Sequence, residues 1–343
     1  MLNKETILIN ILVTGVGGGV GQGIIKSLKL INDLDMNIIS ADMSSLASGL
    51  YGGDFCHLVS AASSSNYFDE IAEICSQHNI DYYFPGTDVE LLACAKSASE
   101  IKEKLGVNII VSPLNVIEIA DDKLKTIEFL AQYGFHYPKT WLPNEVNLES
   151  ISYPVIVKPR IGCRSIGVHI VHTSFEAQSA IDSLIDPILQ EYIDGDEYTC
   201  TVAISKGIVS DVLCLKRDLR AGDTFRAFPQ KNIVIEEYVR NIALALKING
   251  SCNFQLRLAN GIPKLFEINS RFSGTTPFCS YLGFNPVEFC LKHELDMPYY
   301  SEINYNKIIV RHWCEVVLDH SEIEMLNKNK QGKISSTVVS TML

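Results

Sequence analysis

The sequence lacks any apolar stretch that approaches the roughly 18 to 20 residues needed to span a bilayer, although hydrophobic residues make up 47% of its 343 positions. It also lacks an excess of positive charge, because 29 Lys and Arg stand against 40 Asp and Glu and leave a formal charge of -11. That balance argues against a protein that grips nucleic-acid phosphates over a broad surface. We therefore expect neither a membrane nor a nucleic acid as a partner.

Cysteine motifs are absent as well. The 10 cysteines include no CxxC pair and no cluster with histidine, so the sequence predicts neither a zinc site nor a disulfide framework. The apolar segment near the N-terminus is short, runs into a glycine turn and shows no small-residue cleavage site, so we expect no signal peptide. These features predict a folded protein of the reducing cytoplasm, long enough for about two domains.

The first third alternates apolar runs with helical patterns. The near-continuous apolar run ILINILVT (7–14) precedes a glycine-rich turn, and GIIKSLKLI then has apolar residues at helical spacing. A further apolar strand over 37–41 and helices over 67–77 and 89–104 continue the alternation. This pattern predicts an α/β fold for residues 1–113, with a Rossmann-like parallel sheet covered by helices.

The glycine turn itself leaves its role open. Gly15, Gly18 and Gly21 give the spacing GxxGxxG rather than GxGxxG, and Asp42 lies where a ribose-binding acid would be expected. One interpretation is the dinucleotide site of an NAD(P)-dependent oxidoreductase. The alternatives are tight packing between strand and helix, or a site for another ligand. No Tyr-x-x-x-Lys pair occurs in the chain, which weakens the short-chain dehydrogenase interpretation.

A domain boundary is expected near residue 113, where amphipathic helices begin. After them the buried strand YPVIVKPR ends in Lys158 and Arg160, and the loop IGCRSIGV supplies Gly162 and Gly167 before the next strand. Such a loop can place its N–H groups over phosphates while the lysine supplies a point charge. The alternative is an ordinary hairpin with a solvated lysine and arginine.

Two further polar groups follow along the chain. An apolar strand turns near Asp194 in PILQEYIDGDEYT, where the main chain of residues 190–193 can read an adenine edge and Glu197 can accept from ribose hydroxyls. The alternative there is a turn with solvated acids. Three arginines then occur within ten positions and predict an anion site, unless they are a surface cluster: Arg217, Arg220 and Arg226.

The last third contains a hairpin with a polar face. Two strands in CNFQLRLANGIPKLFEINSRFSG are joined at Ala259-Asn260-Gly261, a strong hairpin signal. Period two places Glu267, Asn269 and Arg271 on one face, and Gln255 of the paired strand can lie across from them. Three oxygen-bearing side chains can thus converge on a hard cation such as Mg²⁺, with nucleotide phosphates completing its octahedron.

Four segments in this order resemble the ATP-grasp superfamily, most nearly a single synthetase unit of the carbamoyl-phosphate-synthase large-subunit type. They are DKLKTIEFLAQYGFHYPKT, YPVIVKPRIGCRSIGV, LQEYIDGDEYT and NFQLRLANGIPKLFEINSRFSG. The resemblance covers about residues 7–295. It implies a two-lobed α+β ATP-grasp domain after the Rossmann-like domain, with an N-lobe over 114–190 and a C-lobe over 191–343 that includes the metal site and a C-terminal extension.

The resemblance also assigns roles to individual residues. The nucleotide would contact Lys123, Lys158, Arg160, Ser165, Gly167, Glu191, Ile193 and Glu197. Gln255, Glu267 and Asn269 would hold Mg²⁺, with Mn²⁺ as an alternative. Arg271 and Lys158 would be catalytic, and Arg271 would bind the substrate together with Arg217, Arg220 and Arg226.

The function implied is an ATP- and Mg²⁺-dependent ligase that phosphorylates a carboxylate and couples the acyl phosphate to an amine, with release of ADP and phosphate. Its partners would be small-molecule carboxylate and amine substrates, and a homodimer is a family-level expectation. Two alternatives stay open, the NAD(P)-dependent oxidoreductase and a catalytically silent ATP-binding subunit. The chain departs from carbamoyl-phosphate synthase in having one unit rather than two, and its tail from Met297 matches no motif.

Overall fold

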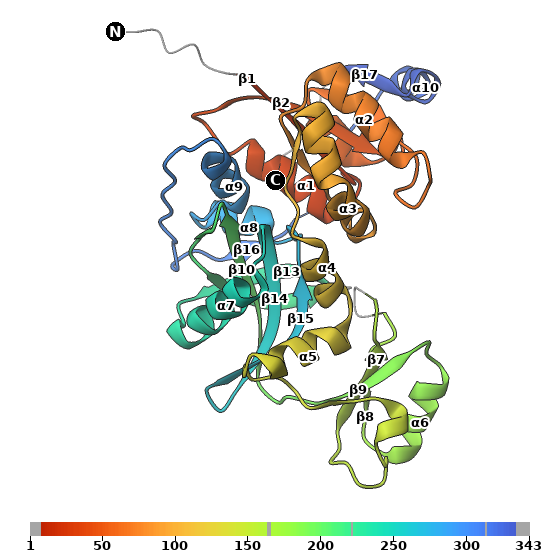
Figure 1. Cartoon of the computed structure of the whole chain (residues 1–343), viewed down its shortest axis with the longest axis vertical. Coiled ribbons are helices and arrows are strands. Elements are labelled where there is room, and N and C mark those ends of the chain that lie inside the picture. The colour runs from red at the N-terminus through yellow and green to blue at the C-terminus, as the bar shows by residue number, and fades with distance from the viewer. Residues whose placement is uncertain (1–7, 163–165, 221, 313, 334–343) are drawn as a thin grey trace.

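The structure is a computed structural model that describes residues 8–162, 166–220, 222–312 and 314–333. Its described strands form three sheets, of six, seven and four strands. Figure 1 shows the first sheet and its helices at one end of the molecule, the large sheet in the middle and the small four-stranded lobe at the other end.

The first sheet has the strand order β17-β3-β2-β1-β4-β5. Its strands are β1 (Leu8–Thr14), β2 (Asp35–Asp42), β3 (Phe55–Leu58), β4 (Tyr82–Phe84), β5 (Asn108–Ile109) and β17 (Gln331–Lys333). β1 to β5 pair in parallel and β17 is antiparallel to β3. The predicted Rossmann-like parallel sheet is therefore confirmed.

Helices cover both faces of this sheet because side chains of its central strand alternate between them. Ile11 and Val13 of β1 pack with α1 (Gly19–Leu28), whereas Leu12 packs with α2 (Tyr67–His78) and α3 (Asp88–Leu105). A short 3₁₀ helix η1 (Ser48–Gly52) lies on the α1 side. Because β1 and β4 are parallel neighbours, the turns that follow them lie at the same edge of the sheet.

The small lobe follows two linking helices, α4 (Leu114–Asp121) and α5 (Lys123–Gln132). Its sheet has the order β6-β9-β7-β8 and is antiparallel. The elements are β6 (Thr140–Trp141), η2 (Pro143–Glu145), β7 (Val155–Pro159), β8 (His169–Val171), α6 (Ser174–Asp182) and β9 (Pro187–Glu191). Its small core includes Val155, Val157 and Leu189.

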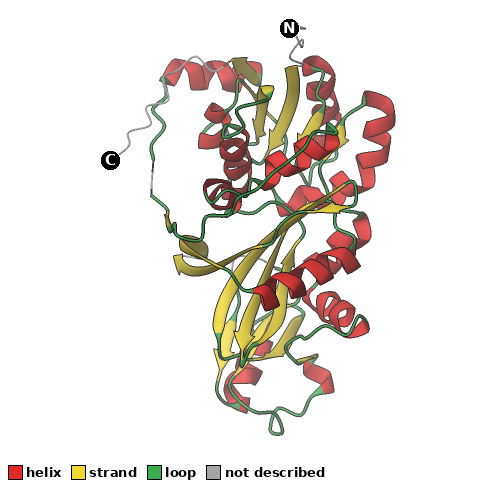
Figure 2. Ribbon diagram, turned by 90° about the vertical axis from the view of Figure 1, so that its left-hand side faces the viewer, coloured by secondary structure: helices red, strands yellow, loops and turns green. Residues whose placement is uncertain are grey.

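The large sheet has the order β15-β14-β10-β12-β13-β16, with β11 paired to β10. Its strands are β10 (Asp196–Ser205), β11 (Ile208–Val209), β12 (Leu213–Arg220), β13 (Asp223–Gln230), β14 (Gly250–Ala259), β15 (Ile262–Asn269) and β16 (Ile309–Val310). Its helices are α7 (Ile233–Leu246), α8 (Thr276–Tyr281) and α9 (Pro286–Glu294). These features, with the small lobe, confirm the two-lobed ATP-grasp architecture after the parallel-sheet domain. Figure 2 shows the sheet as a long twisted layer beneath the first sheet.

The C-terminal tail contributes a strand to each of two sheets. β16 extends the large sheet beside β13, and α10 (His320–Asn329) and β17 then return to the edge of the first sheet. The predicted C-terminal extension thus contributes a strand to the first sheet as well as to the large one. Within the described residues, no helix combines the length and the apolar character needed to cross a membrane.

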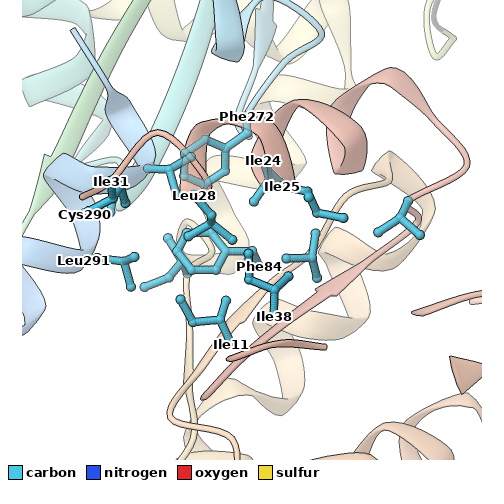
Figure 3. Packing of buried hydrophobic residues seen from close by; sticks show 14 of the residues in the cluster. Ile11, Ile24, Ile25, Leu28, Ile31, Ile38, Phe84, Phe272, Cys290 and Leu291 are labelled. Atoms are coloured by element: carbon cyan, nitrogen blue, oxygen red, sulfur yellow. The ribbon is translucent and has the colours of Figure 1, made fainter. Parts of the chain in front are cut away.

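A shared core joins the first sheet to the large sheet. Phe272, which follows β15, packs among Ile24 and Leu28 of α1 and Phe84 of β4 (Figure 3). The ring centroids of Phe84 and Phe272 are 5.5 Å apart, and Phe272 is buried. The chain just after β15 is therefore anchored in the core of the N-terminal domain.

Candidate active site

A cavity of about 650 Å³ lies where the turns of the first sheet meet the small lobe and the large sheet, and we call it the central cavity. Most of the described site residues predicted from the sequence line it: Lys123, Lys158, Glu191, Ile193, Glu197, Arg217, Gln255, Glu267, Asn269 and Arg271. Segments far apart in the sequence thus supply one site.

The glycine loop is tied to the start of α5. Asp122 caps this helix by accepting from Leu124 N at 3.0 Å, and its other oxygen accepts from Arg160 Nη2 at 2.7 Å. Burial by itself raises the pKa of Asp122, but the Arg160 guanidinium and the helix N–H groups hold that pKa below its ordinary value. Lys123 Nζ donates to the carbonyl of Gly162 at 2.8 Å. Arg160 therefore positions the loop through Asp122 and does not itself line the cavity.

The far side of this loop also needs a glycine. Gly167 has a φ of +72°, and a Cβ atom there would lie 2.9 Å from the Leu184 side chain and 3.0 Å from Pro159. Both the left-handed backbone and the close contacts exclude a larger residue. Ser165, the remaining loop residue predicted to contact ATP, lies outside the described residues.

Lys158 ends β7 as a buried cation. Its side chain points into the cavity, where Nζ donates to Gln190 Oε1 at 2.8 Å and lies 5.6 Å from the centre of the Phe266 ring. Burial lowers the pKa of Lys158 to about 7, partly offset by the nearby Glu267 carboxylate. An anion bound beside this lysine would supply the missing compensation for its charge.

The connection between the lobes carries the residues predicted to contact adenosine. Both carboxylate oxygens of Glu191 accept from Lys264 Nζ at 3.0 Å, and the Ile193 carbonyl accepts from Arg257 at 3.1 Å. Glu197 is held by Arg217 at 2.9 Å and by Arg257 at 3.2 Å. These ion pairs fix the connection between β9 and β10 along one wall of the cavity.

The polar hairpin face is formed as its alternation predicts. Gln255 lies opposite Glu267, and Asn253 lies opposite Asn269. Asn269 Nδ2 donates to Glu267 Oε1 at 3.1 Å, so the two side chains are in direct contact. A register shift leaves Phe266 without a partner in β14. This bulge presents Phe266 and Glu267 to the cavity at consecutive positions, which strict alternation does not predict.

Arg271 extends the same face beyond β15. Its Nη2 donates to Asp88 Oδ2 at 2.8 Å and to Asn269 Oδ1 at 3.3 Å, and its Nε also donates to Asp88. Its Nη1 donates to the carbonyl of Phe272 at 3.0 Å. The side chain is only 12% exposed. The guanidinium is thus held in one orientation beside the predicted metal ligands.

The three clustered arginines are not brought together. Arg217 is 10% exposed, lines the cavity and donates to Gln255 Oε1 at 2.8 Å. Arg220 and Arg226 do not line the cavity. Both guanidinium groups lie over the ring of Phe225 instead, 5.4 and 5.6 Å from its centre. Alternation along β12 and β13 sends their side chains away from the cavity. Only Arg217 is therefore placed to act in this site.

The glycine turn contributes to the cavity, but Asp42 does not line it. Gly18, Gly19 and Val20 line the cavity. Asp42, however, already accepts from the N–H groups of Gly17 at 2.7 Å and Ser44 at 3.1 Å. A Cβ atom at Gly21 would lie 2.7 Å from the Gly15 carbonyl, so close packing of strand and helix requires the glycine there.

The sequence did not point to several residues that line the cavity. Gly86, Thr87 and Asp88 come from the turn after β4, and Arg311 comes from the tail. A turn at the carboxyl end of a parallel strand is a general signal for a site, so Asp88 could have been included. Arg311 offered no such signal.

Comparison with known protein families agrees with this geometry. Residues 120–275 match the ATP-grasp domain family, and residues 11–110 match the PylC-like N-terminal domain family. Residues 120–275 of the chain thus form an ATP-grasp domain.

The chain is similar to large chains of carbamoyl phosphate synthase. That of Bacillus subtilis, arginine-specific, is 25% identical over 235 residues, which are 62% of this chain and 22% of the relative. That of Methanothrix thermoacetophila is 29% identical over 192 residues, 48% of this chain and 17% of the relative. The chain spans about a fifth of the length of such relatives.

The fold of the chain is similar to that of two solved structures. One is N5-carboxyaminoimidazole synthetase from Staphylococcus aureus complexed with ADP, with a TM-score of 0.72 at 15% identity. The matched region covers 94% of this chain and 86% of the synthetase chain. The other is an L-amino acid ligase from Bacillus licheniformis, with a TM-score of 0.63 at 18% identity. The matched region covers 84% of this chain and 74% of the ligase chain.

Proposed function

We propose that the chain is an ATP- and Mg²⁺-dependent carboxylate–amine ligase. The observation that carries this proposal is the convergence of three groups in the central cavity: the lysines of the glycine loop, the oxygen-bearing hairpin face and the oriented Arg271. The proteins that the chain resembles include a carbamoyl phosphate synthase, an L-amino acid ligase and an N5-carboxyaminoimidazole synthetase complexed with ADP.

ATP enters between the small lobe and the large sheet. Lys123 and Lys158 contact the phosphates, and the main chain at Glu191 and Ile193 contacts adenine. Apolar side chains of the cavity wall supply the surface for the base: Ile156, Ile170, Tyr192 and Phe266. The low pKa of Lys158 favours this assignment, because phosphate oxygens would stabilise its charged form.

The hairpin face fits a hard cation. Gln255, Glu267 and Asn269 all line the cavity and carry side-chain oxygen atoms, and the hydrogen bond from Asn269 Nδ2 to Glu267 Oε1 brings two of these side chains together. Oxygen ligands suit Mg²⁺, and Mn²⁺ accepts the same set. Only one of the three is a carboxylate, so nucleotide phosphates would complete the coordination. The bound ion would offset negative charge on the transferring phosphoryl group.

The reaction then needs little acid or base from the protein. A substrate carboxylate oxygen forms a bond to the γ-phosphorus as the bond to ADP breaks, and Arg271 and Lys158 stabilise the charge on the phosphoryl oxygens. The lone pair of the amine next attacks the acyl carbon, phosphate leaves and the amine loses a proton. Arg217, held by Glu197 and Gln255, binds the acid substrate or fixes the metal-bearing face.

The two other interpretations are less favoured. The oxidoreductase would need Asp42 for a ribose, but this carboxylate accepts from the N–H groups of Gly17 and Ser44 and does not line the central cavity. It would also leave the hairpin face unexplained. A silent binding subunit would not need an oriented Arg271. The homodimer and the cytoplasmic location remain predictions made from the sequence and the resemblance.

Trapping of the acyl phosphate tests the proposal. The protein is incubated with ATP, Mg²⁺ and a panel of amino acids, sugar acids and simple acids, with hydroxylamine as the amine, and ADP and hydroxamate are measured. We expect one acid class to raise both, and Glu267→Ala to abolish the effect while the exposed control Glu103→Ala retains it.

Isotope transfer decides between mechanisms. With an ¹⁸O-labelled carboxylate that stimulates ADP release, the label should appear in the phosphate. Release of ADP without label in the phosphate would contradict an acyl phosphate. Tight binding of Mg·ATP with no acid-stimulated ADP release over the panel would favour the silent subunit.

A further inference from the structure

Among the described residues of the tail, Arg311 lines the central cavity. Its backbone is fixed beside the large sheet, because β16 pairs with β13 and the Arg311 N–H donates to the Phe225 carbonyl at 2.9 Å. The two matched family regions end at residues 110 and 275, so Arg311 belongs to neither. Its side chain nevertheless lines the same cavity as the glycine loop and the hairpin face.

The charge of Arg311 is not matched by a carboxylate in the described part of the chain. Four of the described arginines line the cavity, and three of them are paired: Arg217 and Arg257 with Glu197, and Arg271 with Asp88. Arg311 has no carboxylate oxygen of a described residue within 4.0 Å. It donates to the Gly274 carbonyl and lies over the Phe278 ring, 4.8 Å from its centre.

These contacts leave most of the Arg311 donors available. A guanidinium has five N–H donors in a planar fork, and the structure engages one of its nitrogens with a carbonyl. Burial lowers the pKa of Arg311, partly offset by Asp223. A partly buried cation with spare donors is a strong binding group for an anion that can approach through the cavity.

Arg311 also lies close to the reacting end of the site. Arg271 Nη1 donates to the carbonyl of Phe272, and Arg311 Nη2 donates to the carbonyl of Gly274, two residues further along the same loop. The two guanidinium groups therefore flank one loop of the cavity wall.

We propose that Arg311 binds the carboxylate of the acid substrate and is a specificity-determining residue of the ligase. This inference rests on the proposed function. A guanidinium can bind a pair of anionic oxygens in a planar carboxylate or in a tetrahedral phosphate. We assign the carboxylate of the acid substrate as the group that Arg311 binds. In this assignment Arg311 holds the acid carboxylate and Arg271 faces the phosphoryl group.

Anion titration of the Arg311→Met protein tests the assignment, because methionine keeps an apolar stem over Phe278. Acetate, succinate and inorganic phosphate are titrated at constant ionic strength into the ligand-free protein and into the Mg·ADP complex, and binding is measured by calorimetry. We expect the parent to bind the carboxylates saturably and Arg311→Met to lose at least tenfold in their affinity. Lys307→Ala, which removes an exposed cation of the same segment, should bind them like the parent.

Three results would overturn the proposal: equal carboxylate affinity in Arg311→Met and the parent, saturable binding of phosphate alone, or no saturable anion binding by the parent. The affinity for Mg·ADP is measured in the same experiment and should not change in Arg311→Met. Failure of the parent to bind Mg·ADP would instead contradict the proposed ligase function, and the ligand-free titration would still report on Arg311.

Discussion

Asp88 holds the guanidinium of Arg271 from a different domain. Nε and Nη2 of Arg271 both donate to the Asp88 carboxylate, the second at 2.8 Å, although the two residues are 183 positions apart. Asp88 opens α3, and the residue after Arg271 is anchored in the core of the same domain (Figure 3). The N-terminal domain thus sets the orientation of the cation that we place at the transferring phosphoryl group.

The first prediction concerns this contact. Asp88→Ala should lower kcat about tenfold or more, since a misplaced catalytic group costs up to about a hundredfold, while KM for ATP changes little. The melting temperature should hardly move, because Asp88 is 46% exposed and exposed ion pairs contribute less than about 1 kcal/mol. Asp88→Glu should restore part of kcat. An unchanged kcat in Asp88→Ala would show that Arg271 needs no such support.

A second prediction concerns Glu90, which is buried beneath the same turn. Its Oε2 accepts from the hydroxyls of Thr14 at 2.6 Å and Tyr83 at 2.8 Å, and its Oε1 accepts from the N–H groups of Gly86 and Thr87 at 2.7 Å. In Glu90→Gln the side-chain NH₂ group would face these hydroxyl and N–H donors in place of a carboxylate oxygen. The substitution should therefore lower the free energy of unfolding by about 3 kcal/mol. Thermal unfolding measures this loss. The control Glu100→Gln, at an exposed position of the same helix, should melt like the parent.

The third prediction follows from the pKa of Lys158. Burial lowers this pKa from 10.5 to about 7, so the unfolded chain binds more protons than the folded protein between these values. The cost of the buried charge is complete below about pH 7 and falls as the pH rises toward 10.5. Lys158→Met should therefore raise the melting temperature most at pH 6 and little near pH 10.

Nucleotide binding gives the same group a second readout. Phosphates bound beside Lys158 favour its charged form, so the parent should take up close to one proton when it binds Mg·ADP at pH 8. Calorimetry in two buffers of different ionisation enthalpy measures this uptake. Lys158→Met should show almost none. Equal proton uptake by the two proteins would contradict the place that we give to Lys158.

Local periodicity was sufficient to predict the elements and one wall of the site. Alternation along β15 predicted that Glu267, Asn269 and Arg271 share a face, and the Asn260-Gly261 turn predicted that Gln255 lies opposite. These relationships depend on residues near one another in the chain or joined by one tight turn. The parallel sheet was predictable for the same reason, because each apolar run and helical pattern is local.

Relationships set by packing were not predictable in this way. The bulge at Phe266 depends on how β14 and β15 twist together, and no residue type in the local sequence predicts it. The separation of Arg217 from Arg226 depends on which face of β12 and β13 turns inward, since charged residues occur on both faces. Arg311 reaches the cavity only because the tail crosses to β13, a contact that no spacing encodes.

The glycine turn shows why the sequence left one question open. Glycine is required both where a phosphate approaches the backbone and where a helix packs closely on a strand. Gly21 meets the second requirement, because a Cβ atom there would lie 2.7 Å from the Gly15 carbonyl. The same spacing is therefore compatible with a turn that binds no dinucleotide.

The most direct test of the central claim is the thermal stability of the parent and of Glu267→Ala with a non-hydrolysable ATP analogue, with and without Mg²⁺, and with NADH or NADPH. At about 100 times its Kd a ligand adds roughly 2.7 kcal/mol of stability. The account predicts that Mg·analogue stabilises the parent and that Glu267→Ala loses the Mg²⁺-dependent part of this gain. Stabilisation by a nicotinamide cofactor alone, or an equal response of the two proteins to Mg·analogue, would contradict it.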